Sequence, residues 1–77
     1  MSESEYTFEM EPTGTIFISM ERGMWVADFS HTSIAARLHN ANGSTRMPTP
    51  FSSRTPVAKV RATIMDLNQG CDVKAIA

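Results

Sequence analysis

The chain has 77 residues, a formal net charge of -1 and one cysteine. That length fits a single domain spanning residues 1–77, and a hydrophobic content of 42% is typical of a globular protein rather than a disordered one. The lone cysteine excludes an internal disulfide and suits a reducing compartment. The acidic start lacks the apolar stretch of a signal peptide, and the longest apolar run, residues 24–27, is far shorter than the roughly 20 residues that span a bilayer. We therefore expect a cytoplasmic protein that does not associate with membranes.

The first predicted element is a strand. Residues 6–11 alternate apolar and polar side chains, as a strand with one buried face requires. The inward-facing side chains would be Tyr6, Phe8 and Met10. Residues 1–5 either form a disordered acidic tail or lead into this strand. Glu11-Pro12-Thr13-Gly14 has the residue types of a type I turn, so the chain is expected to reverse there.

Residues 15–20 and 24–29 are predicted to form a β-hairpin around Glu21-Arg22-Gly23. One register keeps the large apolar side chains together on one face, and a shift by one residue breaks that face. Its apolar pairs are Met20 with Trp25, Ile18 with Ala27, and Ile16 with Phe29. Its other face pairs Phe17 with Asp28, Ser19 with Val26, and Glu21 with Met24, and is more apolar than a water-facing sheet usually is.

Residues 31–42 are predicted to form a short helix, because Ile34 and Leu38 are four residues apart on one helical face. Asn42-Gly43 would end this helix, and Ser30, Thr32 or Ser33 would cap its start.

The next segment, residues 44–54, contains Pro48, Pro50 and many hydroxyl side chains. It is predicted to be an ordered but irregular loop that Phe51 anchors in the core.

The last two elements are a helix and a strand. Thr55-Pro56 resembles a helix cap followed by proline at the first helical position. Apolar residues follow at helical spacing, with Lys59 and Asp66 on the opposite side, and residues 68–70 close the helix. The apolar stripe consists of Val57, Val60, Ile64 and Leu67. In the final strand Cys71, Val73 and Ala75 alternate with Asp72 and Lys74.

The predicted order of elements is β-β-β-α-loop-α-β. This order favours an α+β fold, a small two-layer sandwich in which the helices pack on one face of a mainly antiparallel sheet. A chain of this size buries only about 60% of the surface that its unfolded form exposes, so its core is marginal and a homodimer or a bound partner would stabilise it.

The side chains that could carry chemistry are His31, His39 and Cys71. None of them stands with a base or a nucleophile at the spacing of a known catalytic motif. The histidines are eight residues apart, and with Asp28 and Cys71 they match no zinc-finger or zinc-ribbon spacing. The four glycines lie in separate turns and form no phosphate-binding loop. We predict no enzymatic activity and no metal or cofactor site.

Charge is distributed unevenly along the chain. Residues 1–12 carry four glutamates and no basic side chain, whereas residues 31–61 carry five basic side chains and no acidic one. The basic segment could bind an anionic partner such as nucleic acid, although a pI of about 6.0 argues against a dedicated nucleic-acid binder. The alternative is a set of solvated basic side chains. The residues of the nucleic-acid hypothesis are Arg37, Arg46, Phe51, Arg54, Lys59 and Arg61.

The preferred interpretation is a small non-enzymatic interaction module that inhibits or regulates a larger cytosolic complex. Its partner would be another protein or a second copy of the chain, bound at an uncovered sheet face or a sheet edge. The apolar side chains on the second face of the hairpin motivate this interpretation. Its expected binding residues are Phe17, Arg22, Met24, Val26 and Asp28. The competing interpretation is that the 44–54 loop covers this face.

Overall fold

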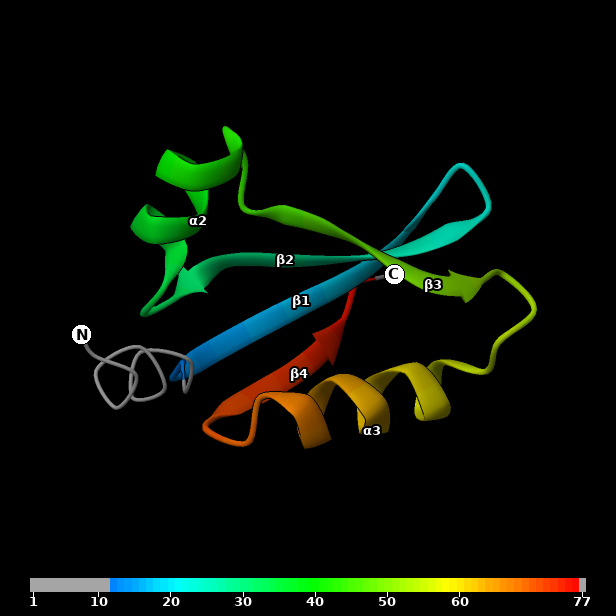
Figure 1. The fold of residues 1–77 in the computed structure, drawn as a ribbon. Helices are drawn as coiled ribbons and strands as arrows, with labels where there is room; N and C mark the ends of the chain where they lie inside the picture. The colour runs from blue at the N-terminus through cyan, green and yellow to red at the C-terminus, as the bar shows by residue number, and fades with distance from the viewer. Residues whose placement is uncertain (1–11, 77) are drawn as a thin grey trace.

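The computed structural model describes residues 12–76, and this part of the chain has an α+β fold with a four-stranded mixed sheet and two helices (Figure 1). The strand order is β3-β2-β1-β4, in which β1 pairs antiparallel with β2, β2 antiparallel with β3, and β1 parallel with β4. The predicted strand at residues 6–11 and the tail at residues 1–5 lie outside the described residues. The elements are β1 (Gly14–Glu21), β2 (Met24–Thr32), α2 (Ala35–Asn42), β3 (Arg46–Ser52), α3 (Val57–Leu67) and β4 (Cys71–Ala75).

Strands β1 and β2 form the predicted hairpin. Its two-residue turn is Arg22-Gly23, and both residues have positive φ angles, 54° and 80°, as the favoured hairpin turns require. The register confirms the predicted pairs Met20 with Trp25 and Ile18 with Ala27, and all three pairs of the opposite face. The third apolar pair is different, because the register shifts between Thr15 and Phe17 at a β-bulge. Phe29 still packs against the core.

Strand β3 corrects the prediction of an irregular loop at residues 44–54. Arg46–Ser52 is an edge strand that extends the sheet beyond β2. The Phe29 N–H donates to the Thr45 carbonyl at 2.9 Å, so the odd-numbered residues here turn their backbone groups toward β2. The even-numbered Pro48 and Pro50 therefore lie where an N–H would point to the free edge, and their missing donors cost no ladder hydrogen bond.

The core lies between α3 and the sheet. Val60 and Ile64 of α3 are buried against strand residues, while both ends of the predicted apolar stripe are open to solvent, with Val57 41% and Leu67 73% exposed. Phe51 is partly buried against this core, as predicted. The buried residues are Ile16, Ile18, Ala27, Val60, Ile64, Cys71 and Val73.

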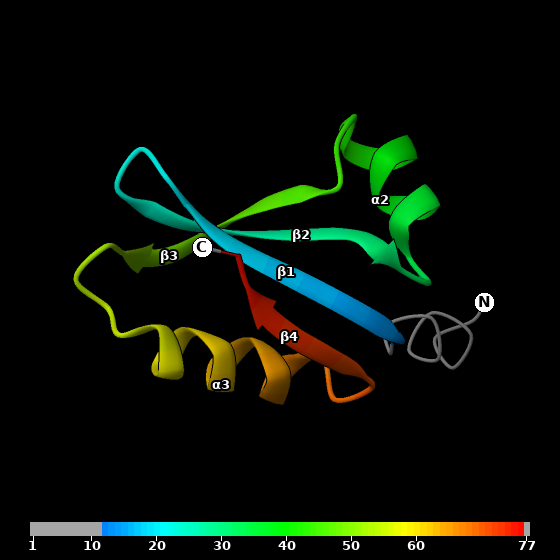
Figure 2. The same ribbon diagram turned by 180° about the vertical axis from the view of Figure 1, so that it is seen from behind.

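The two helices have different relations to the sheet. Helix α3 runs alongside β4, and α2 lies at the end of β2 away from the hairpin turn, in both views (Figures 1 and 2). Only α3 therefore supports the predicted placement of helices on one face. Helix α2 contains no buried residue and begins later than predicted, because β2 continues to Thr32. Gly43, in the left-handed conformation, ends α2 as expected. No helix among residues 12–76 is long and apolar enough to cross a membrane.

Candidate protein-interaction surface

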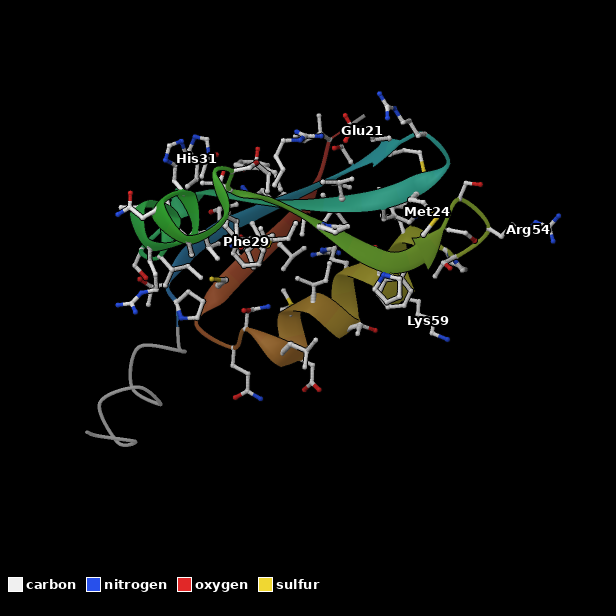
Figure 3. All side chains as sticks on the ribbon, turned by 45° about the horizontal axis from the view of Figure 1, so that its top comes forward. Glu21, Met24, Phe29, His31, Arg54 and Lys59 are labelled. Atoms are coloured by element: carbon white, nitrogen blue, oxygen red, sulfur yellow. The ribbon has the colours of Figure 1, made fainter. Side chains whose placement is uncertain are left out.

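The side of the sheet opposite α3, here called the open face, carries the side chains that alternate with the core residues. In β1, Phe17 lies between the buried residues Ile16 and Ile18 and pairs with Asp28 of β2. Figure 3 shows His31 and Glu21 on this side of the sheet and Phe29 on the side toward α3. The open face includes Phe17, Ser19, Glu21, Met24, Val26, Asp28, His31, Arg46 and Pro48, and from β4 Asp72 and Lys74, which alternate with the buried Cys71 and Val73.

The centre of the open face is apolar. Phe17 and Val26 are half-buried, and Met24 is 38% exposed. Pro48 of β3 lies opposite Val26 and is exposed. The rings of His31 and Phe17 make a T-shaped contact with centroids 5.2 Å apart, which favours one orientation of the Phe17 side chain. Apolar side chains from three neighbouring strands thus lie on one face, with Asp28 and Lys74 beside Phe17 and Ser19 beside Val26.

Charged side chains border this apolar centre. Arg46 of β3 reaches over β2 to Glu21 of β1, with its Nη2 atom 2.9 Å from Glu21 Oε1. Its Nη1 atom lies 3.9 Å from Asp28 Oδ2. The hydrogen bond and charge of Glu21 raise the pKa of Arg46 above its usual value. Since Arg46 and Glu21 remain 43% and 53% exposed, water screens this pair and its contribution to stability is small.

Asp28 is the most enclosed of these charges, with 27% of its side chain exposed. Partial burial opposes ionisation of its carboxyl group, but hydrogen bonds from the Ser30 N–H at 2.9 Å and the Thr45 hydroxyl at 3.0 Å favour the carboxylate. With the positive charge of Arg46 nearby, these hydrogen bonds lower the pKa of Asp28. Asp28 is therefore a fixed anion on the open face at neutral pH.

The structure brings four of the five predicted binding residues together. Phe17, Met24, Val26 and Asp28 share the open face, while Arg22 lies at the tip of the hairpin turn. Sequence analysis did not place Arg46 and Pro48 on this face, because it assigned their segment to a loop, and it named Arg46 only for the nucleic-acid hypothesis. The sequence signal that could have revealed this strand is a period-two alternation, in which Arg46, Pro48 and Pro50 alternate with the core-facing residues Met47, Thr49 and Phe51.

The residues of the nucleic-acid hypothesis lie on separate parts of the molecule. Arg37 belongs to α2, and Arg54 follows β3 (Figure 3). Arg46 is paired with Glu21 on the open face, whereas Arg61 of α3 donates from Nε to the Val73 carbonyl at 2.9 Å. Phe51, the candidate for stacking on bases, is partly buried against the core on the opposite side. Lys59 is exposed on α3, and the six residues as a set share no single face.

The titratable residues considered for chemistry are also separated. Cys71 is buried at the start of β4, where burial raises the pKa of its thiol, so the reactive thiolate is disfavoured. His31 lies on the open face and His39 is exposed on α2. Within residues 12–76 no three side chains of His, Cys, Asp or Glu come together as metal ligands.

A second apolar surface lies on the α3 side of the sheet. Helix α3 does not extend over β3, and a cleft of about 260 Å³ remains between them. Phe29 and Phe51 line it from the sheet, and Ile64 and the exposed Leu67 from the helix. This cleft is continuous with the core and carries no charged side chain, unlike the open face.

Comparison of the chain with protein-family models, curated proteins and solved structures gave no match.

Proposed function

We propose that this chain is a small non-enzymatic interaction module that binds another protein, or a second copy of itself, through the open face. In this role it acts as an inhibitor or regulator of a larger assembly. The observation that supports this proposal is a group of apolar side chains from three strands with charged neighbours, on the side of the sheet opposite α3, while α2 lies at the end of β2.

The arrangement matches the physical requirements of a binding surface. Aromatic and long apolar side chains at the centre of an interface provide most of its affinity once water is excluded, while border charges set the rate and specificity of association. The contact with His31 favours one orientation of Phe17, which lowers the conformational entropy that is lost when a partner covers this side chain. Most of the segment 44–54, which could have covered this face, instead forms β3 (Arg46–Ser52) and widens the sheet.

The experiment compares three versions of the full chain. The double variant Phe17→Ala plus Met24→Ala removes the apolar centre, and Leu67→Ala is the matched control, because it removes an exposed apolar side chain on the α3 side. Sedimentation measures self-association, and affinity purification from host lysate with added nuclease measures partner binding. We expect the double variant to weaken association by more than about 30-fold, or about 2 kcal/mol, and the control to leave it unchanged.

Circular dichroism melts of the same proteins show whether the fold persists. A folded double variant that associates as the unchanged chain does would refute the proposal. Equal losses in the double variant and in Leu67→Ala would place the contact elsewhere.

A further inference from the structure

Strand β4 lies at an edge of the sheet, and its outer side has backbone groups without partners among residues 12–76 (Figure 1). The Ile76 N–H donates to the Ile18 carbonyl at 2.8 Å, so the even-numbered residues of this segment face β1. The odd-numbered residues therefore turn their N–H and C=O groups to the free edge. There the Arg61 Nε atom donates to the Val73 carbonyl at 2.9 Å, but no described residue accepts from the N–H groups of Val73 and Ala75. Such an edge can pair with another strand.

The exposed side chains of β4 carry opposite charges two residues apart. Asp72 and Lys74 are exposed and alternate with the buried Cys71 and Val73. Neither charge forms a salt bridge with another residue of the described part of the chain. On the open face, β4 therefore has an acidic side chain on one side of Val73 and a basic side chain on the other.

This arrangement is self-complementary about Val73. When two β4 strands run antiparallel with Val73 opposite its own counterpart, Asp72 of each copy lies opposite Lys74 of the other. Val73 then forms a hydrogen-bonded pair at the two-fold axis, and Asp72 and Lys74 fall in the closer, non-hydrogen-bonded pairs. A shift of the register by two residues in either direction sets Asp72 or Lys74 opposite its own counterpart. Charge therefore favours the register that is centred on Val73.

We propose that two copies of this chain pair through the outer edges of β4, as an antiparallel dimer centred on Val73. Each Val73 N–H donates to the Val73 carbonyl of the second copy, and each Ala75 N–H donates to the Cys71 carbonyl of the second copy. The Cys71 N–H is already bound to the Asn68 carbonyl at 2.9 Å and needs no partner. The two sheets become one continuous sheet, which removes both free edges of β4. Such a dimer also stabilises a chain whose core is marginal for its size.

Helix α3 borders the same edge. The groove between the first half of the helix and the end of the strand is lined by Val57, Ala58, Arg61, Val73, Lys74 and Ala75. Ala58 and Ala62 are exposed and one turn apart, so small side chains allow α3 of the second copy to approach closely. Arg61 occupies one lone pair of the Val73 carbonyl oxygen, and the other can accept the N–H of the second copy. Both Arg61 side chains are exposed, so salt and water screen their mutual repulsion.

The edge dimer leaves the apolar side chains of the open face available. Its two-fold axis is perpendicular to the sheet, so both α3 helices lie on one side of the joined sheet and both open faces on the other. Phe17 and Met24 of each copy can still contact another protein. Sedimentation of the Phe17→Ala plus Met24→Ala variant would still detect the edge dimer, so partner capture is the readout that reports the open face.

The test reverses charges on β4 of the full chain and measures dimerisation by sedimentation over a concentration series. Asp72→Lys sets lysines opposite each other in both cross-strand pairs, and Lys74→Asp sets aspartates opposite each other. We expect each variant to dimerise at least about tenfold more weakly than the unchanged chain. An equimolar mixture of the two variants should form a heterodimer as tight as the unchanged dimer, because every lysine then faces an aspartate.

The matched control is Lys59→Asp, which makes the same charge change as Lys74→Asp. Lys59 is exposed and lies about 200° around α3 from Arg61, away from the β4 edge. This variant should dimerise as the unchanged chain does.

Amide hydrogen exchange by NMR locates the contact. We expect the amides of Val73 and Ala75 to be protected at concentrations where the chain is a dimer, and to exchange at least about tenfold faster in Asp72→Lys. The Ile18 amide, which pairs with β4 inside the sheet, reports that each variant is folded.

A chain that stays monomeric at NMR concentrations would overturn the proposal, as would folded variants that fail to recombine into the heterodimer. A dimer in which Val73 and Ala75 exchange rapidly would form through another surface and also overturn it. Protection of these amides in the monomer would place a segment of the same chain on the edge, against the proposal. These readouts do not depend on whether the open face binds a partner.

Discussion

Asp28 shows how single side chains in this sheet combine structural and electrostatic roles. Its carboxylate accepts hydrogen bonds from Ser30 and Thr45, and these contacts lower its pKa below the ordinary value of 3.8. The folded chain therefore binds this proton more weakly than the unfolded chain. The stabilisation is present above about pH 4 and is lost as pH falls through the lowered pKa of the folded state.

The first prediction is that Asp28→Asn has a flatter dependence of unfolding free energy on pH than the unchanged chain. An asparagine oxygen can still accept the two hydrogen bonds, but it does not titrate. Urea unfolding at pH 7 and at pH 3 measures the effect, and the gap between the two proteins should be smaller at pH 3. Parallel pH profiles would contradict this origin of acid sensitivity.

A second residue-scale prediction concerns the buried side of α3. Ile64 is 6% exposed in the core, so Ile64→Ala should cost about 2 to 5 kcal/mol, enough to unfold much of a domain with a marginal core. Lys59 is exposed on the same helix, and Lys59→Ala should cost less than about 0.5 kcal/mol. Denaturant melts distinguish them, and similar midpoints would show that Ile64 is not a core residue.

At the scale of elements, period-two and helical patterns predicted the hairpin, α3 and β4, because each buries a regular apolar face. They missed β3, because its prolines resemble a loop signal unless the strand lies at an edge. Pro48 and Pro50 fall on alternate positions that face away from β2, and this depends on pairing that no local pattern reveals. The start of α2 was also missed, because Ser33 contacts Thr13, 20 residues away, instead of capping the helix.

The candidate site was predictable where it lay within one hairpin. Phe17, Met24, Val26 and Asp28 share a face by alternation alone, once the register is known. The contact of Arg46 with Glu21 joins β3 to β1 across β2, and the predicted loop gave no reason to expect it. This contact depends on the order β3-β2-β1 within the four-stranded sheet, which no local sequence pattern reveals.

A third prediction tests the start of β1, where Gly14 pairs with Thr32 beyond the β-bulge. Gly14 has φ of 117°, and an added Cβ would collide with the His31 carbonyl oxygen and lie 2.9 Å from Thr32 Cα. Gly14→Ala should therefore destabilise the fold by more than about 2 kcal/mol, since strain and collision both act.

The matched variant is Gly23→Ala in the hairpin turn, where φ is 80° and no atom lies within 4 Å of the added Cβ. It should cost only about 1 to 2 kcal/mol, from backbone strain alone. Thermal unfolding of both variants measures the difference. Equal losses would mean that the close approach of β2 to Gly14 has no energetic role.

At the scale of the whole molecule, folding disperses the basic residues of the segment 31–61. Arg46 is paired with Glu21, Arg61 is bound to a backbone carbonyl, and Arg54 lies in the segment that connects β3 to α3. Phosphate backbones bind most strongly to several cations that act on one face, and the affinity then falls steeply with salt. This fold does not present such a face among the residues of the nucleic-acid hypothesis.

The last prediction is that the chain binds a labelled DNA duplex more weakly than about 10⁻⁴ M at physiological salt, outside the usual range of non-specific binders. Fluorescence polarisation between about 50 and 200 mM salt measures both the affinity and its salt slope. Three cooperating cations would give a slope of about -2.7 in log K against log salt, and we expect a slope near zero.

Tight binding with a steep slope that the double variant Arg54→Gln plus Lys59→Gln abolishes would restore the nucleic-acid hypothesis. Those two side chains have no described acidic partner within residues 12–76. Binding through the open face, in contrast, should change little over the same salt range, since its centre is apolar.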